Sequence, residues 1–458
     1  MQFKRFKPLN NLTLKIMHKI DPNSLTTNAL FNIPLDELIP KDHPKRIILD
    51  KAPWDELVRI ARKAYKSDYW KDKPNARIMT GLFIWACIAD DQTYRNIEDD
   101  FRFNSLCAYA CGFKNIEKRN IHHTTLLKFE EHLGEENVLK IKDIIEKISV
   151  DNQPPNSKGR HSSDTTVFES NITFPTDTKL METVRLFLVD DIINDYQKEV
   201  NQDHRTYNRT ARKDFTDFAR KRIISQEQVR KIKKTQLQYL KRNISQAEEV
   251  MKSLKEKIDK NEFILKRKAD QKAFQRLKTK LSIAKQIYSQ QYALFKGEKI
   301  KDRIVSFHRP NVRPIFRGKA KKKTEFGPKV QTSLMGRALI IGKISYNNFH
   351  DGHGTKEAIE EMQKKKYPIK EQIGDKGLSG ITGFLKENNI VDGIEKRGIR
   401  KKAPPIPKKR FASARNRKEG VYGLIKTVFI KGLRAKTDYG DLKKICKAAI
   451  GYNLRYAF

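Results

Sequence analysis

The sequence feature that most constrains the fold is a long segment without glycine or proline, residues about 205–296, which interrupts a region of strand-like sequence. Its apolar residues keep the 3–4 spacing of a coiled-coil seam, at Leu237, Leu240, Ile244, Ala247, Met251, Leu254 and Ile258. A second set follows after a phase break, at Phe274, Leu277, Leu281, Ala284 and Tyr288. The pattern predicts an inserted helical arm, either one helix with a stutter or two helices folded together. Its basic outer faces either grip DNA or are solvated flanks.

The sequence on both sides of this arm indicates strands. Residues 161–174 are rich in Thr, Val, Phe and Ile and predict strand structure, followed by a helix over about 179–199. Strand patterns return at 303–307, 326–335 and 337–348 and then alternate with helices. Strands that begin before the arm and resume after it imply one α/β domain with an insertion. We therefore expect residues 151–204 and 301–458 to be two parts of one domain, with residues 205–300 as the inserted arm.

The first third of the chain has a helical pattern. Residues 1–24 are expected to form a basic arm, and residues 25–150 are expected to be an all-α domain that either binds DNA or serves dimerisation. Residues 78–89 are apolar almost all round and predict a central buried helix. They are too few to span a bilayer, and the N-terminus lacks the features of a secretory signal. A linker rich in proline, glycine and polar residues, 152–160, separates the two regions.

The charge of the chain points to a polyanionic partner. Lys and Arg total 95 against 55 Asp and Glu, which gives a formal net charge of +40 at pH 7. A compact fold with this excess repels itself unless a polyanion screens it. Nucleic acid is the first candidate, because each neutralised phosphate releases counterions. The four cysteines, including Cys107 and Cys111, lack zinc-site spacing and are interpreted as core residues of a cytoplasmic protein.

Three acidic residues stand out by their local context. Asp164 lies within the first strand pattern, and Asp375 follows another strand between Gly374 and Gly377, which would allow phosphate to approach the backbone. Glu419 lies in a predicted helix, where one face carries Arg415, Glu419, Gly423 and Lys426. The alternative for this helix is an exposed, salt-bridged surface. The pair His122 and His123 is expected near a helix start, and HDGH (350–353) is expected in a loop rather than at a metal site.

The chain resembles the DDE transposases of bacterial insertion sequences over roughly residues 33–458. The segments that carry the resemblance are PLDELIPKDHPKRIILD, ARIMTGLFIWACIADDQTYRNIEDDFRFN, HHTTLLKFEEHL, SDTTVFESNITFPTD, RIVSFHRPNVRPIFRGKAKKKTEFGPKV, IGDKG, RNRKEGVYGLIK and GDLKKICKAAIGYNLR. Two positions depart from the family pattern. Ala412 stands where a tyrosine is frequent, and Leu378 stands where an aromatic residue is common. The missing tyrosine removes one expected phosphate contact.

The resemblance implies an RNase H-like mixed sheet with a long coiled-coil insertion, preceded by a helical domain. It places the three metal-binding carboxylates on Asp164, Asp375 and Glu419, with Arg415 and Lys426 as DNA contacts. Two Mg²⁺ or Mn²⁺ ions would serve hydrolysis at the element's end and then strand transfer. The implied partners are the terminal inverted repeats and target DNA, bound by a homodimer or higher complex in the nucleoid. The alternatives are a catalytically inactive DNA-binding protein and a metal-dependent nuclease that does not join strands.

Overall fold

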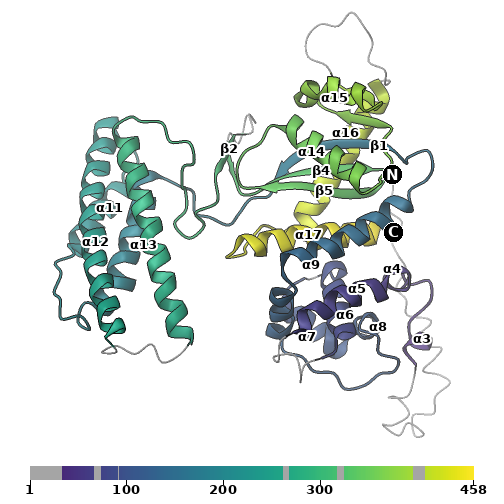
Figure 1. Ribbon diagram of the computed structural model, residues 1–458, viewed down its shortest axis with the longest axis horizontal. Coiled ribbons are helices and arrows are strands. Elements are labelled where there is room, and N and C mark those ends of the chain that lie inside the picture. Colours follow the sequence, from purple (N-terminus) through teal and green to yellow (C-terminus); the bar gives the residue numbers. More distant parts are fainter. Residues whose placement is uncertain (1–33, 67–73, 91, 261–267, 317–323, 396–407) are drawn as a thin grey trace, which may run out of the picture.

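The computed structural model describes residues 34–66, 74–90, 92–260, 268–316, 324–395 and 408–458. The chain has a mixed α/β architecture with helices on both faces of one sheet (Figure 1). A group of N-terminal helices lies against the sheet region through α9 and α17, and a bundle of long helices stands apart at the other end of the molecule.

The sheet is mixed and has five strands in the order β5-β4-β1-β6-β7. Strand β1 is central, pairs antiparallel with β4 and pairs parallel with β6, and the outer pairs are β4–β5 antiparallel and β6–β7 parallel. The strand bounds are Arg160–Val167 (β1), Lys329–Met335 (β4), Ala338–Ser345 (β5), Glu371–Gly374 (β6) and Val391–Ile394 (β7). A separate two-stranded ribbon joins β2 (Pro314–Phe316) and β3 (Thr324–Phe326). The predicted strands at 326–335 and 337–348 are confirmed. The strand predicted at 303–307 is wrong, because that segment is extended without strand pairing and packs Ile304 and Phe307 against the arm.

The two faces of the sheet bury different helices. Met335 and Ile340 point to one face, where they pack with α14 (Asp351–Lys364), η4 (Lys376–Ile381) and α15 (Thr382–Glu387). Leu334 and Ile341, their neighbours in sequence, point to the other face and pack with α16 (Lys408–Leu424), η5 (Ile425–Ile430) and α17 (Asp438–Tyr456). This alternation is the period of two expected for a strand that is buried on both sides. The sheet is therefore the middle layer of three.

The arm consists of several helices with their own core. Helices α12 (Gln226–Asp259) and α13 (Lys268–Phe295) contact each other along their length, so the seam predicted from the sequence belongs to two helices and not to one. Helix α10 (Asp177–Phe187) and the π-helix η3 (Leu188–Asn194) pack into the same core, and α11 (Asn208–Ala219) contacts α12. The helical unit therefore starts near residue 177, earlier than the boundary at 205 expected from the sequence.

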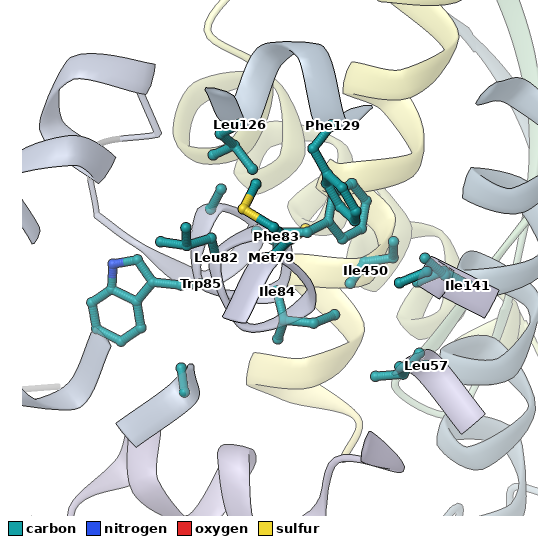
Figure 2. Close-up of a cluster of buried hydrophobic side chains, with 14 of the residues drawn as sticks. Leu57, Met79, Leu82, Phe83, Ile84, Trp85, Leu126, Phe129, Ile141 and Ile450 are labelled. Carbon is teal, nitrogen blue, oxygen red and sulfur yellow. The ribbon is translucent and has the colours of Figure 1, made fainter. Parts of the chain in front are cut away.

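The N-terminal helices form a core around α6, as Figure 2 shows. Phe83 and Met79 of α6 lie beside Phe129 of α9, and Ile450 of α17 closes the same cluster. This confirms the central buried helix predicted at 78–89, and all four cysteines are buried and unpaired as expected. The helix bounds are Leu35–Leu38 (α3), Pro44–Lys51 (α4), Trp54–Ala61 (α5), Arg62–Lys66 (η1), Ala76–Ile88 (α6), Tyr94–Phe103 (α7), Ser105–Ala110 (α8) and His123–Asp151 (α9), the last kinked at Gly134.

Helix α17 belongs to two cores at once. Ile450 and Leu454 are buried among the N-terminal helices, whereas Ala448 and Tyr452 are buried against the sheet. The helix was predicted at about 439–456 and is observed at Asp438–Tyr456.

Candidate active site

Asp164, Asp375 and Glu419 line one small pocket of about 100 Å³. The other lining residues are Ser162, Ser163, Ile373, Gly374 and Lys418. The three acids come from three elements, namely the centre of β1, the end of β6 and the middle of α16. The structure thus brings together the carboxylates that the sequence analysis singled out, although they are separated by 44 to 255 positions along the chain.

Strand pairing explains why the first two acids meet. The parallel register places Ser162 of β1 opposite Ile373 of β6. Asp164 and Asp375 each lie two residues beyond that pair, so they lie beside each other where the pairing of β1 with β6 ends and Asp375 follows the carboxyl end of β6. Carboxyl ends of parallel strands are the edges where α/β sheets place their ligand sites.

The backbone after β6 is shaped by a turn. Asp375 caps η4, and its Oδ1 accepts a hydrogen bond from the Gly377 amide at 2.9 Å. A Cβ added to Gly374 would lie 2.2 Å from Leu378 Cδ1. The expectation that Gly374 opens the backbone to phosphate therefore needs correction, because Leu378 fills that space. Glycine here serves close packing inside the turn.

Lys418 lies buried beneath the acids and was missed by the sequence analysis. Its Nζ donates hydrogen bonds to the carbonyl oxygens of Ser162 at 2.7 Å and Thr332 at 3.2 Å. Burial lowers the pKa of Lys418 to about 7, although the nearby carboxylates of Asp164 and Asp375 act to raise it. The signal was present in the sequence, because Lys418, Val421 and Ile425 share the helix face that packs on the sheet. A lysine on an apolar face must find polar partners or lose its proton.

The two predicted DNA contacts are placed differently from each other. Arg415 lies within α16, but its side chain is outside the described residues. Lys426 lies outside the acidic pocket, with its Nζ 5.6 Å from the centre of the Phe168 ring. The predicted single face over 415–426 assumed a regular α-helix. The backbone changes to the π-helix η5 at Ile425, so Lys426 lies in a wider turn than a regular α-helix would give it.

The donor set of the pocket fits a hard divalent cation. Mg²⁺ and Mn²⁺ take carboxylate oxygens, and three carboxylates from different elements face one small space. Their oxygens are not drawn into one tight cluster. Among the described residues, a different group meets the criterion for a tight metal site, which is at least three Asp, Glu, His or Cys side chains with ligand atoms all within 4.8 Å of one another. This group consists of Glu98, His122 and His123. Like charges hold carboxylates apart until a cation binds them.

The group of Glu98, His122 and His123 has a structural explanation. His122 is the N-cap of α9 and His123 is its first residue, which agrees with their predicted place near a helix start. Glu98 Oε2 accepts hydrogen bonds from the His123 amide at 2.8 Å and from its Nδ1 at 2.9 Å, while Arg102 pairs with Oε1 at 2.6 Å. The carboxylate is thus already satisfied. The second histidine pair was predicted to lie in a loop, and this is wrong, because His350 caps α14 and residues 351–353 form its first turn.

Comparisons with known proteins do not extend these observations. No protein-family model matches the chain, and no match is found among curated proteins or solved structures. Within the described part of the chain, no helix is both long enough and apolar enough to cross a membrane.

Proposed function

We propose that this protein is a DDE-type DNA transposase that cleaves the ends of an insertion sequence and joins them to target DNA. The observation that carries the proposal is the pocket shared by Asp164, Asp375 and Glu419. Acids this far apart in sequence have no local reason to meet in one pocket. A cation-binding site would account for three carboxylates that meet in this way.

The surrounding fold supports the same proposal. A mixed sheet with β1 at its centre, flanked by helices on both faces, suits the RNase H-like domain that the resemblance implies. The N-terminal helices would be the accompanying helical domain, which binds DNA or mediates dimerisation. The strong positive charge suits long contacts with DNA phosphates.

Each residue of the pocket has a proposed role. Asp164, Asp375 and Glu419 would hold two divalent cations, which supply positive charge to the attacking and leaving oxygens of a phosphodiester. Lys418 holds the carbonyls of β1 and β4 from below and so positions the strand that carries Asp164. Arg415 and Lys426 would hold phosphates beyond the pocket, and two copies of the chain would each engage one element end.

The test uses the full chain with Mn²⁺ and a duplex taken from the flanks of its gene. Asp375→Asn and Glu419→Gln are expected to lower cleavage by at least about 10³-fold, because several kcal/mol of charge stabilisation are lost. DNA binding should persist in both variants. Glu387→Gln on α15 is the matched control, since Glu387 is exposed and lies outside the pocket.

The products separate the proposal from its alternatives. Joined products support a transposase, and cut ends that never join support a metal-dependent nuclease. A chain that binds DNA without cutting it, and for which Asp164→Ala behaves as wild type, is an inactive DNA-binding protein.

A further inference from the structure

A second, much larger cavity lies where η5 ends and α17 begins. We call it the corner cleft, with residues 92–94, Leu127 and Glu131 on one wall and residues between 428 and 447 on the other. Its volume is about 800 Å³, against about 100 Å³ for the acidic pocket. The first wall belongs to α9 and the start of α7, and the second to η5, α17 and the loop between them. The cleft is therefore built where the N-terminal helices meet the helices that cover the sheet.

The corner cleft has a strong excess of positive charge. Six cations line it, against the single carboxylate of Glu131, and they are Lys431, Arg434, Lys436, Lys443, Lys444 and Lys447. Lys443 and Lys447 both pair with Glu130, which is fully buried beneath the cleft. The other four have no ion pair with any residue that the structure describes. Lys431, Arg434 and Lys436 are exposed, so their charges face the cleft opening and solvent.

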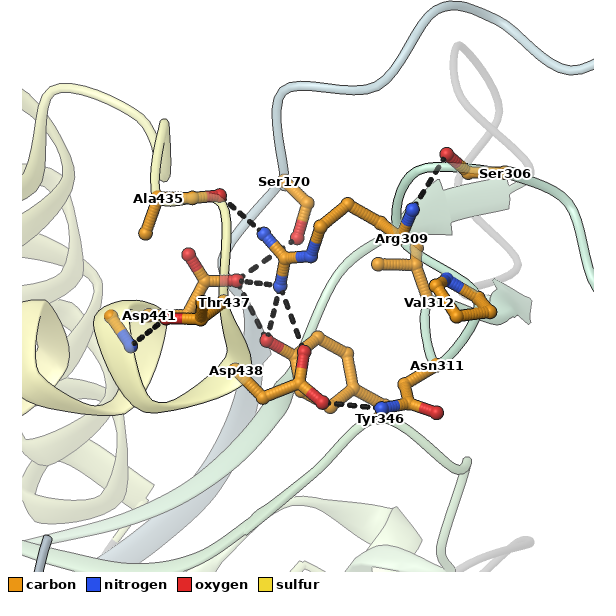
Figure 3. Close-up of polar contacts among 12 residues, drawn as sticks. Ser170, Ser306, Arg309, Asn311, Val312, Tyr346, Ala435, Thr437, Asp438 and Asp441 are labelled. Atoms are coloured by element: carbon orange, nitrogen blue, oxygen red, sulfur yellow. Dashed lines mark hydrogen bonds and ion pairs between the residues drawn. The ribbon is translucent and has the colours of Figure 1, made fainter. Parts of the chain in front are cut away.

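The loop that carries these cations is held firmly in place. Arg309 donates hydrogen bonds to the Ala435 carbonyl at 2.6 Å and to Asp441 at 2.6 Å, as Figure 3 shows. Thr437 caps α17 by accepting from the Gly440 amide at 3.0 Å (Figure 3). On the other side of the loop, Lys444 Nζ donates to the Gly432 carbonyl at 3.3 Å. The cations are therefore presented by an ordered backbone, which reduces the entropy lost when an anion binds.

Like charges crowd together in the corner cleft, and a bound anion would relieve their repulsion. Burial lowers the pKa of Lys444, and the neighbouring charges of Lys447 and Arg434 lower it further. Two of the chain's remaining segments, residues 317–323 and 396–407, are rich in Lys and Arg and contain no Asp or Glu, so they add no negative charge. The volume is also far larger than the ~30 Å³ that one water-sized molecule occupies. A polyanionic chain fits both the size and the charge.

We propose that the corner cleft binds the phosphate backbone of one strand of duplex DNA. That the polyanion is DNA rests on the proposed function. The corner cleft would be a second place, outside the acidic pocket, where the protein holds that DNA. Glu419 and Val428 are nine positions apart along the continuous helix α16–η5, which corresponds to roughly 14 Å at 1.5 Å per residue. That length is on the order of four base pairs of duplex at 3.4 Å each. One DNA segment would follow the helix and reach both sites.

The experiment measures binding of a labelled duplex by fluorescence anisotropy, with the full chain in EDTA and over a range of salt concentrations. The test variant combines Lys431→Gln, Arg434→Gln and Lys436→Gln. The matched control combines Lys147→Gln, Lys198→Gln and Lys364→Gln, which removes the same charge from exposed positions outside the cleft. Each lost phosphate contact reduces the slope of log K against log salt by about 0.9. The test variant is expected to lose about 2 to 3 in slope, and the control less than 1.

Equal slopes for the two triple variants would overturn the cleft proposal. Displacement of the duplex by polyglutamate as effectively as by unlabelled DNA of equal charge would also overturn it, in favour of an acidic protein partner. Cleavage by the wild type with Mn²⁺ is measured in parallel. If wild type cleaves DNA but the two triple variants have equal salt slopes, only the cleft proposal is refuted. If the salt slope falls in the test variant but wild type does not cleave DNA, the transposase proposal is refuted and the cleft proposal is supported.

Discussion

Glu130 offers the sharpest test of how the N-terminal helices are joined to the rest of the protein. Its carboxylate is fully buried and accepts hydrogen bonds from Lys443 and Lys447, each at 2.7 Å, and from the Tyr94 hydroxyl. Burial acts to raise the pKa of Glu130, but the two lysines outweigh it and hold the pKa at about 2. Relative to an ordinary value of 4.5, this shift corresponds to about 3 kcal/mol at 1.36 kcal/mol per unit.

Glu130→Gln is expected to lower the free energy of unfolding at pH 7 by about 3 to 5 kcal/mol, because it leaves two buried ammonium groups without their anion. The pH dependence has a definite sign. A depressed carboxyl pKa stabilises the fold above the unfolded pKa of about 4.5, and this stability is lost as the pH falls toward 2. The gap between wild type and variant should therefore shrink by about 2 kcal/mol between pH 7 and pH 3.

Urea unfolding followed by circular dichroism measures this gap, with Glu131→Gln as the control at the neighbouring exposed position. The control should stay within about 0.5 kcal/mol of wild type. A Glu130→Gln protein as stable as the control at pH 7 would refute the reasoning. A gap that does not change with pH would show that the carboxylate is not the group that matters. The triple change Glu130→Leu, Lys443→Met and Lys447→Met should recover much of the loss, because no charge is left buried.

Three further outcomes are expected. The folded-state pKa of Lys418 is lowered to about 7. In EDTA, the free energy of unfolding of wild type should therefore rise by about 1.4 kcal/mol per pH unit between pH 7 and 10, relative to that of Lys418→Met. Urea unfolding midpoints of both proteins at pH 7 and 9 measure this difference, and midpoints that change in parallel contradict it. Gly451→Ala should destabilise by more than about 2 kcal/mol, since its Cβ would lie 2.1 Å from the Cys87 carbonyl. Gly423→Ala, which has open space, should stabilise by about 0.5 to 1 kcal/mol, and thermal melts compare the two. Added Mn²⁺ should raise the unfolding free energy by about 2.7 kcal/mol at 100 times its Kd, an effect that Asp164→Asn combined with Asp375→Asn should remove.

Elements with strong local patterns could be predicted from the sequence. The apolar runs of β4 and β5 and the period of α17 depend only on neighbouring residues, and their bounds agree with the prediction to within a few positions. The meeting of Asp164 and Asp375 was also accessible, because each acid follows or lies in a recognisable strand.

Features that depend on distant packing could not be predicted. Residues 303–307 have strand composition, yet Ile304 and Phe307 are used by the core of the arm. Helix α10 has a pattern compatible with either the sheet or the arm, and only its packing shows which one it joins. The change to a π-helix at Ile425 has no sequence signature and was not predicted. The corner cleft combines residues more than 300 positions apart, so no local sequence pattern predicts it.

The double membership of α17 has a consequence for folding during synthesis. The N-terminal helices leave the ribosome hundreds of residues before the helix that supplies Ile450 and Leu454 to their core. Until residue 456 has emerged, the core of the N-terminal helices stays incomplete. The sheet face that Ala448 and Tyr452 cover also stays exposed until then. Nascent chains that stop early therefore expose apolar surface at two places at once, which makes them targets for chaperones and proteases. Because one helix closes both cores, the two parts of the protein become stable together once α17 has been made.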